Sequence, residues 1–244
     1  MSAPGPGPTD GTPPVDSQLA AHLGQALEAV RATAGDPAVA AARQVGETLR
    51  RVIDRLTATS APPEVLLEAA ERLEQVRGLL QPFDTVRRYE GASEASGLAQ
   101  DRAFFDWSPQ LGLSNPLAPP IRVAVRDGAV VGTARFGIAY EGPPGCVHGG
   151  HIAAAFDEVL GLTQTLSGQV GMTGTLSVRY RRPTPLYSQL TFEGRVDTVS
   201  GRKVFTSGRL MAGEELTAEA TGLFIAISPE RFLAGADRRQ PDRD

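Results

Sequence analysis

The residues best suited to chemistry lie where a glycine-rich loop runs into a helix, around His148. Glycine and proline dominate residues 142–146 and exclude regular structure, whereas apolar residues recur at helical spacing from Ile152 onward. A helix start carries unpaired backbone N–H groups and a partial positive charge. Gly149 and Gly150 let a substrate approach those N–H groups closely. This joint predicts an oxyanion-binding site for a carbonyl oxygen, although the same donors would also suit a phosphate.

Asp157 is the second chemical candidate, nine residues after His148 and within the apolar helix. An unpaired carboxylate on a buried helix face is costly, so it needs a partner or a function. One turn away stand Ala153 and Gly161, whose small size predicts a recess that a substrate or another chain could enter. The alternative is a capping or surface acid with Glu158 as its solvated partner. The residues alone leave both interpretations open.

The histidines and the single cysteine allow other interpretations. Cys146, His148 and His151 form a Cys-x-His-x-x-His pattern that could bind a metal. They sit on a bend, and no second Cys/His group completes a structural zinc site, so no metal is expected. Cys146 could instead act as a nucleophile with His148 as its base, or pack as a small apolar residue. The Lys-Ser/Thr of a P-loop is missing, so a nucleotide site is not expected.

Polar residues of the following strands complete the candidate site. Thr173 opens the strand after the helix, where its hydroxyl could hydrogen-bond a water or a carboxylate, or merely reflect strand propensity. Positive charge gathers in two places, around Arg179 and Arg181 and at the turn with Arg202 and Lys203. Such bands suit a phosphorylated, anionic cofactor tail, although solvated strand ends produce the same pattern.

These residues belong to a segment whose pattern predicts an α+β fold. Strands at 121–126 and 129–137 flank Asp127-Gly128, a strong two-residue hairpin signal. One long helix follows and ends near Gly168. Alternating apolar and polar residues then predict four strands, at 172–181, 189–199, 203–211 and 216–227. The short turns imply antiparallel neighbours with the helix lying across the sheet, unlike a Rossmann-type fold.

The first hundred residues differ in character. Residues 1–16 are rich in proline, glycine, threonine and aspartate, and we expect them to be disordered. Apolar stripes over 19–30, 45–56 and 66–80 predict three amphipathic helices, and a linker follows at 90–97. No catalytic constellation is found here, so 17–100 are assigned to a helical accessory region with its linker. Residues 229–244 are assigned to a flexible C-terminal tail.

Composition excludes several classes of protein. The 244 residues are 41% hydrophobic and 21% charged, with a net charge of −4, which is ordinary for a soluble globular protein. Neither half is basic enough to predict a nucleic-acid partner. No apolar run approaches the roughly 18 residues of a membrane span, and the N-terminus lacks the pattern of a signal peptide. One cysteine excludes an intramolecular disulfide, and the expected location is the cytoplasm.

Together these residues resemble the hotdog-fold acyl-CoA thioesterases of the phenylacetate-pathway (PaaI-like) type, in particular the branch that includes mammalian carboxyl-terminal modulator protein. The matching segments, in chain order, are 141–150, Asp157, Met172-Thr173, 180–186 and 201–205. The agreement covers residues 104–228, and the ordered set is more specific than any one segment. The resemblance implies a hotdog domain at 101–228, with one long helix wrapped by an antiparallel sheet, which pairs into a homodimer or a dimer of dimers.

The resemblance also implies roles for the site residues. Asp157 would be the catalytic carboxylate, as a general base on water or as a nucleophile, and the Gly150 N–H would polarise the thioester carbonyl. His148 would shape the loop, and Thr173, from the neighbouring subunit's site, would help to place the water. The Gly150 loop and the Asp157 of one site would come from different chains. Coenzyme A would contact Gly149, Arg179, Arg181, Arg202 and Lys203, of which Arg179 and Arg181 replace an asparagine and a lysine of the family.

The implied function is hydrolysis of a medium- to long-chain fatty acyl-CoA to the free acid and coenzyme A. No metal or separate cofactor is implied, because coenzyme A is part of the substrate and the reaction needs only an activated water and a stabilised oxyanion. Two alternatives stay open: a non-catalytic acyl-CoA-binding or scaffolding protein with the N-terminal helices as its docking arm, and an enoyl-CoA hydratase. The set of His148, Asp157 and Thr173 argues against the scaffolding protein.

Overall fold

The structure is a computed structural model that describes residues 21, 23–25, 36–83 and 105–227. Its elements in chain order are α2 (Pro37–Thr57), α3 (Pro63–Leu80), β1 (Arg122–Arg126), β2 (Ala129–Ala134), η2 (Ile138–Tyr140), α6 (Gly149–Thr165), β3 (Gly171–Tyr180), β4 (Leu190–Ser200), β5 (Lys203–Ala212) and β6 (Glu215–Ala226). The six predicted strands and the long helix all appear, each within three residues of its predicted bounds. The predicted disordered N-terminus, the linker and the tail lie outside the described residues.

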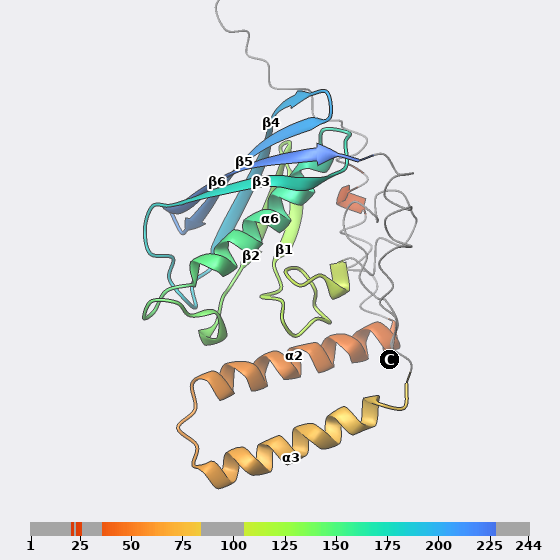
Figure 1. Cartoon of the computed structure of the whole chain (residues 1–244), viewed down its shortest axis with the longest axis vertical. Helices are drawn as coiled ribbons and strands as arrows, with labels where there is room; N and C mark the ends of the chain where they lie inside the picture. Colours follow the sequence, from red (N-terminus) through yellow and green to blue (C-terminus); the bar gives the residue numbers. More distant parts are fainter. Residues whose placement is uncertain (1–20, 22, 26–35, 84–104, 228–244) are drawn as a thin grey trace, which may run out of the picture.

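The six strands form one antiparallel sheet in the order β1-β2-β4-β5-β6-β3, and α6 lies across it (Figure 1). The chain leaves the sheet after β2, runs through α6, and re-enters at the opposite edge as β3. Short turns join the strands from β4 to β6, which makes them antiparallel neighbours. This arrangement confirms the predicted α+β fold, a sheet wrapped around one long helix.

The core lies between α6 and the sheet. Ile152, Phe156 and Val159 follow one another at helical spacing and are at most 2% exposed. The ring of Phe156 meets that of Phe192 on β4 edge to face, with centroids 5.3 Å apart. Full burial of a side chain of this size contributes roughly 1.5–3 kcal/mol. The apolar face of α6 therefore fixes how the helix rests on the sheet, and with it where the ends of the helix lie.

The β1–β2 hairpin turns at the two residues that the sequence indicated. Asp127 and Gly128 have φ angles of 49° and 69°, which is the left-handed pair that a type I′ turn requires. The second strand is shorter than predicted, however, because its pairing with β4 ends at Ala134. Beyond it Phe136 turns into the core, where it is fully buried, and the chain enters η2.

Two of the three predicted N-terminal helices are confirmed, as α2 and α3. The first predicted helix lies mostly outside the described residues, and its described positions 21 and 23–25 are helical. Helix α2 contacts the sheet domain through polar groups. Arg43 forms an ion pair with the buried Asp106 at 2.7 Å, and Arg50 donates to the carbonyl oxygens of Leu113 and Asn115. Helix α2 is thus held by specific hydrogen bonds at both of these arginines.

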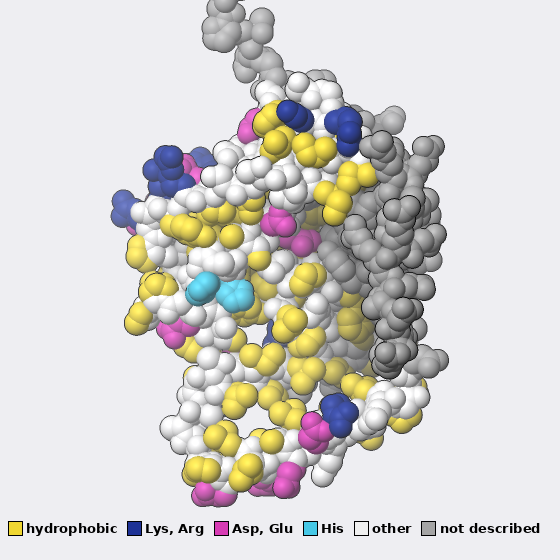
Figure 2. Space-filling view, viewed as in Figure 1, with side chains coloured by type: hydrophobic (Ala, Val, Ile, Leu, Met, Phe, Trp, Pro, Cys, Tyr) yellow, Lys and Arg dark blue, Asp and Glu magenta, His cyan; other side chains and the backbone are white. Residues whose placement is uncertain are grey.

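Helix α3 packs much less tightly than α2. None of its residues is buried, and several large apolar side chains on it are exposed, among them Leu67, Leu79 and Leu80. Figure 2 shows apolar side chains spread over this helix pair. Among the described residues, no helix has the combined length and apolar character needed to cross a bilayer.

Gly46 is the position where α2 comes closest to the sheet domain. It is buried, and a Cβ there would stand 2.8 Å from the carbonyl oxygens of Leu113 and Ser114. Gly46→Ala is therefore expected to lower the free energy of unfolding by about 1–3 kcal/mol, although alanine is the better helix former. Gly78→Ala on α3 is the matched control, since its Cβ would meet nothing within 4 Å and should stabilise slightly. Urea unfolding of both variants checks this, and a stabilised Gly46→Ala would contradict the close approach.

Candidate active site

The loop before α6 is built by backbone contacts and one acid. Gly145 adopts a φ of +75°, and its N–H donates to the Glu141 carboxylate at 2.7 Å. Glu141 and Val147 then form an isolated bridge, and the His148 N–H donates to the carbonyl oxygen of Tyr140 at 2.8 Å. The loop is therefore fastened on both sides before α6 begins at Gly149.

His148 is the N-cap of α6. Its Nδ1 accepts the N–H of Gly150 at 3.0 Å, and its carbonyl oxygen accepts the N–H of His151 at 3.0 Å. An accepting Nδ1 requires the neutral ring with its proton on Nε2. Among the described residues, the Gly149 N–H has no hydrogen-bond partner. Of the two N–H groups at this joint, the Gly149 N–H is therefore open and the Gly150 N–H is held by the imidazole.

Tyr180 closes the joint from the far end of β3. Its hydroxyl donates to the carbonyl oxygen of Gly149 at 2.7 Å. A Cβ at Gly149 would lie 3.2 Å from the tyrosine ring and its oxygen, so a side chain there would have to displace the Tyr180 ring slightly. No role of Tyr180 at the site was predicted from the sequence. An aromatic residue within the Arg-Tyr-Arg run at the end of a strand was the only available signal.

Asp157 and Thr173 lie side by side. The Thr173 hydroxyl donates to Oδ1 of Asp157 at 2.8 Å, and both residues are exposed. A register shift in the β3–β6 pairing between Thr173 and Thr175 marks a β-bulge beside this contact. Bulges re-aim side chains and are frequent next to active sites. The bulge at the start of β3 is thus part of how Thr173 is presented to α6.

Asp157 lies on the exposed side of the helix, which agrees with the surface acid and not with the buried carboxylate, the two interpretations that the sequence left open. One expectation about Thr173 is corrected. Thr173 contacts the Asp157 of its own chain, so it does not have to come from a neighbouring subunit to meet this carboxylate. The helix turns by about 100° per residue, and the apolar stripe did not reveal which of two adjacent acids points outward.

Glu158 is the more enclosed of the two acids, although part of its surface stays exposed, so the interpretation of Glu158 as a solvated partner is wrong. Burial raises the pKa of its carboxyl to about 7, the negative charge of Asp157 adds to this rise, and a hydrogen bond with the Ser108 side chain opposes it. Ser108 is fully buried, and its oxygen also accepts the N–H groups of Gln110 and Leu111. Glu158 thus faces the segment that precedes β1.

Glu158→Gln is expected to change how stability depends on pH. The folded-state pKa of about 7 lies above the ordinary 4.5, so the folded state binds more protons between these values. The protonated Glu158 carboxyl therefore stabilises the folded wild type fully below pH 4.5, and this stabilisation is lost as the pH rises through 7. The free energy of unfolding of the variant, measured relative to that of the wild type, should therefore rise by on the order of 2 kcal/mol from pH 5 to pH 8. Urea unfolding at both pH values measures it.

The control for this experiment is Glu214→Gln, which changes an exposed glutamate in a turn. Its stability relative to the wild type should be the same at pH 5 and pH 8. An unfolding free energy of Glu158→Gln that tracks the wild type at every pH would contradict an enclosed Glu158.

The ring of His151 packs beside Tyr140 and His148. Its ring meets Tyr140 edge to face with centroids 5.0 Å apart, and the ring of His148 lies 6.0 Å away. Burial, followed by the nearby His148, lowers the pKa of His151 below its ordinary value. Figure 2 shows the two described histidines, in cyan, next to each other at the surface. Nothing in the described part of the chain groups three potential metal ligands, and Cys146 Sγ lies 3.6 Å from the carbonyl oxygen of Pro144.

The two basic groups are separated within one chain. In the sheet register, Arg179 on β3 lies opposite Glu219 of β6. Lys203 on β5 lies opposite Ile225, which is six positions further along β6. At roughly 3.3 Å per residue, this spacing corresponds to about 20 Å. The guanidinium of Arg181 forms an ion pair with Glu219 at 2.6 Å. Arg202 Nε donates to the carbonyl oxygen of Ala226 at 2.9 Å.

Gly150 and Asp157 also lie apart within one chain. They are seven residues apart on the same helix. With a rise of 1.5 Å per residue, the separation along the axis is about 10 Å. A carbonyl oxygen bound at Gly150 and a water bound at Asp157 of the same chain would therefore be too far apart to react with each other.

Three comparisons with known proteins agree on the family. A family model described as "Thioesterase superfamily" matches residues 144–219. The acyl-coenzyme A thioesterase THEM4 of Mus musculus is 39% identical over 99 residues, which are 40% of this chain and 43% of that protein. THEM4 of Xenopus laevis is 42% identical over 92 residues, 36% of this chain and 41% of that protein. This chain thus spans less than half the length of these curated relatives.

The third comparison is with solved structures. The crystal structure of a thioesterase superfamily protein matches with a TM-score of 0.68 and 35% sequence identity, covering 75% of this chain and 94% of that one. A match of this identity over nearly the whole of a relative goes beyond a shared fold. This chain belongs to the thioesterase superfamily.

Proposed function

We propose that this protein hydrolyses the thioester of acyl-CoA, with Asp157 as the group that activates water. The observation that carries the proposal is the exposed Asp157 carboxylate, which the Thr173 hydroxyl orients from 2.8 Å. Curated relatives named acyl-coenzyme A thioesterase support the same substrate class. A medium- to long-chain fatty acyl group is the proposed acyl part.

The two oxygens of Asp157 have different tasks in this proposal. Thr173 donates to Oδ1, which leaves Oδ2 to accept a proton from the attacking water. The water oxygen bonds to the thioester carbon while the carbonyl π electrons move onto oxygen. When this intermediate collapses, the C–S bond breaks, and the thiolate of coenzyme A takes up the proton from Asp157. The products are the free acid and coenzyme A, and no further reactant is required.

The start of α6 stabilises the oxyanion in this mechanism. The Gly149 N–H, which is unpaired among the described residues, and the Gly150 N–H both belong to the positive end of the helix. The Gly150 N–H must exchange the imidazole of His148 for the oxyanion as the substrate binds. His148 therefore acts by keeping this donor satisfied until a carbonyl oxygen arrives.

We infer further that each site combines the Gly150 of one chain with the Asp157 of a second. The axial distance of about 10 Å within one helix supports this, because both groups must reach one thioester. The exposed edge of the sheet supports it as well. Among the described strands β3 pairs only with β6, and Met172 and Tyr180 on β3 are about half exposed, as expected for an edge that a second copy covers.

The coenzyme A part of the substrate is assigned to the basic groups. Arg179 and Lys203 have no ion-pair partner among the described residues, so their charges are free for phosphate. Arg181 is neutralised by Glu219, and Arg202 keeps two of its three guanidinium nitrogens for a ligand. The two basic groups lie about 20 Å apart in one chain. A single coenzyme A therefore contacts either one group alone, or one group from each of two chains.

A thiol-release assay across acyl-CoA chain lengths tests the proposed function. Hydrolysis is expected, with the highest kcat/KM for medium to long acyl chains. Tight acyl-CoA binding without thiol release at any chain length would favour the scaffolding protein instead. Loss of the enoyl absorbance of crotonyl-CoA would favour the hydratase.

A further inference from the structure

A cavity of about 440 Å³ lies between α2 and the β1–β2 edge of the sheet, away from Asp157. One face of α2 forms its first wall, with Glu47, Arg50, Arg51 and Asp54 at helical spacing. Small-molecule sites in proteins commonly occupy 300–1,000 Å³. The cavity is therefore large enough for a small ligand.

Positive charge dominates this cavity although the chain as a whole carries −4. Four arginines line it, namely Arg50, Arg51, Arg122 and Arg135, against the two acids Glu47 and Asp54. The formal charge of the lining is therefore +2.

The two acids are already engaged. Glu47 forms ion pairs with Arg50 at 3.2 Å and with Arg51 at 3.0 Å, while Asp54 accepts the N–H of Ala139 at 3.3 Å. In the described parts of the chain, neither acid forms an ion pair with the two arginines that lie on the sheet side of the cavity.

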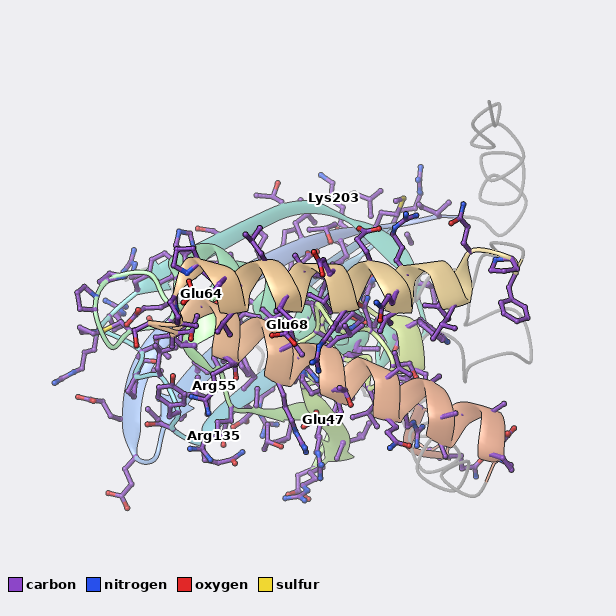
Figure 3. All side chains as sticks on the ribbon, turned by 90° about the horizontal axis from the view of Figure 1, so that it is seen from below. Glu47, Arg55, Glu64, Glu68, Arg135 and Lys203 are labelled. Atoms are coloured by element: carbon purple, nitrogen blue, oxygen red, sulfur yellow. The ribbon has the colours of Figure 1, made fainter. Side chains whose placement is uncertain are left out.

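Arg122 and Arg135 are those two arginines. Neither has an ion pair or hydrogen bond with any side chain in the described parts of the chain, and both are exposed. Arg122 is the cross-strand neighbour of Thr133, and Arg135 comes two residues later on the same side. Figure 3 shows Arg135 and Glu47 on the side of α2 that faces away from α3, with Lys203 far across the molecule. Two unpaired arginines thus stand at the mouth of the cavity.

Much of the remaining wall is apolar. Pro116, Pro119 and Pro120 line the cavity together with Ile53 and Tyr140. The Tyr140 hydroxyl is fixed by donating to the carbonyl oxygen of Leu117 at 3.1 Å. Proline rings and an aromatic side chain give a preformed surface for a small apolar or ring-shaped group.

We propose that this cavity binds a phosphate monoester with a small apolar body. A phosphate monoester carries a charge of about −1.5 to −2 at pH 7, which matches the +2 of the lining. Guanidinium groups bind phosphate oxygens through paired N–H donors, and Arg122 and Arg135 supply two such groups. The ester's apolar part rests against the prolines. This site differs from the proposed coenzyme A contacts, which lie at the start of α6, at the end of β3 and at the β4–β5 turn.

Isothermal titration with phenyl phosphate tests the proposal, since this probe combines a dianion with a ring. The wild type should bind it, and Arg122→Gln/Arg135→Gln should weaken the affinity by at least about tenfold. Arg126→Gln is the matched control, because it removes an exposed arginine of β1 outside the cavity. It should leave the affinity unchanged. Each single substitution is measured as well, with circular dichroism as the check of folding.

Inorganic phosphate and benzyl alcohol separate the two parts of the probe. Both should bind the wild type more weakly than phenyl phosphate, because each lacks one of the matched groups. Absence of phenyl phosphate binding, or equal affinity in the wild type and the double variant, would overturn the site. Equal affinity for inorganic phosphate and phenyl phosphate would overturn the assignment of an ester with an apolar body.

Discussion

Asp157→Asn is expected to lower kcat for acyl-CoA hydrolysis by roughly 10²–10⁴, the usual contribution of a general base. The amide keeps the shape of the carboxylate and can still accept the Thr173 hydroxyl through its oxygen. It cannot take a proton from water at neutral pH. Because Asp157 is exposed and outside the core, the variant should fold and associate as the wild type does. Steady-state kinetics with the best acyl-CoA substrate measures the loss.

Asp197→Asn is the matched control for this variant. Asp197 is also an exposed aspartate on a regular element, and its Oδ1 likewise accepts a hydroxyl, that of Ser207, at 2.6 Å. It lies on β4 rather than on α6, so its change should leave kcat within about twofold of the wild type. Hydrolysis by Asp157→Asn at the wild-type rate would remove Asp157 from the mechanism.

Gly150→Pro is expected to lower kcat by about 10²–10³, because it removes a backbone N–H that stabilises the oxyanion. Proline is tolerated in the first turn of a helix, where the N–H has no intrahelical acceptor, so α6 should still form. Gly150→Ala is the comparison that isolates the N–H. It keeps the donor, and its Cβ would approach His148 Nδ1 to 3.1 Å, a contact that a small ring shift relieves.

The kcat of Gly150→Ala should therefore be well above that of Gly150→Pro. Equal losses in both would mean that crowding of the imidazole, and not the lost N–H, causes the effect. Substrate binding measured by KM should change less than kcat, since the N–H acts mainly on charge that develops in the transition state.

The sequence predicted the elements of the fold because their signals are local. The left-handed pair at Asp127 and Gly128, the alternation along β4 and the apolar stripe of α6 each depend on residues within one element. The end of β2 was placed three residues too late because Phe136 is apolar whether it continues a strand or turns into the core. The pattern of one strand does not record where its partner stops pairing.

The sequence named candidate residues for the site but did not predict how they are arranged. Residues His148, Asp157 and Thr173 were all named, and the pairing of Asp157 with Thr173 was left open as one use of the hydroxyl. Glu158 forms a hydrogen bond with the side chain of Ser108, which lies 50 positions earlier in the chain. A helical stripe carries no information about such a distant partner. The apolar stripe therefore could not decide between the two interpretations of Asp157.

The N-terminal helices illustrate the same limit. Periodicity predicted both α2 and α3, but it did not distinguish the helix that contacts the sheet domain from the one that has no buried residue. The difference depends on Gly46, Arg43 and Arg50, whose partners lie more than 60 residues away. From the sequence alone, a glycine within a helix indicates only low helix propensity. Its role in close packing is recognised only when the carbonyl oxygens that it faces are known.

The central claim is that the Gly150 loop and Asp157 of one site come from two chains, and mixing two inactive variants tests it most directly. Gly150→Pro and Asp157→Asn chains, carrying different tags, are co-expressed and the mixed species is purified through both tags. One of the two sites in each mixed dimer then has both native groups, so an equal mixture should recover about a quarter of wild-type kcat, and the purified mixed dimer about half. Activity that stays at the level of the two parents would contradict a site shared between chains.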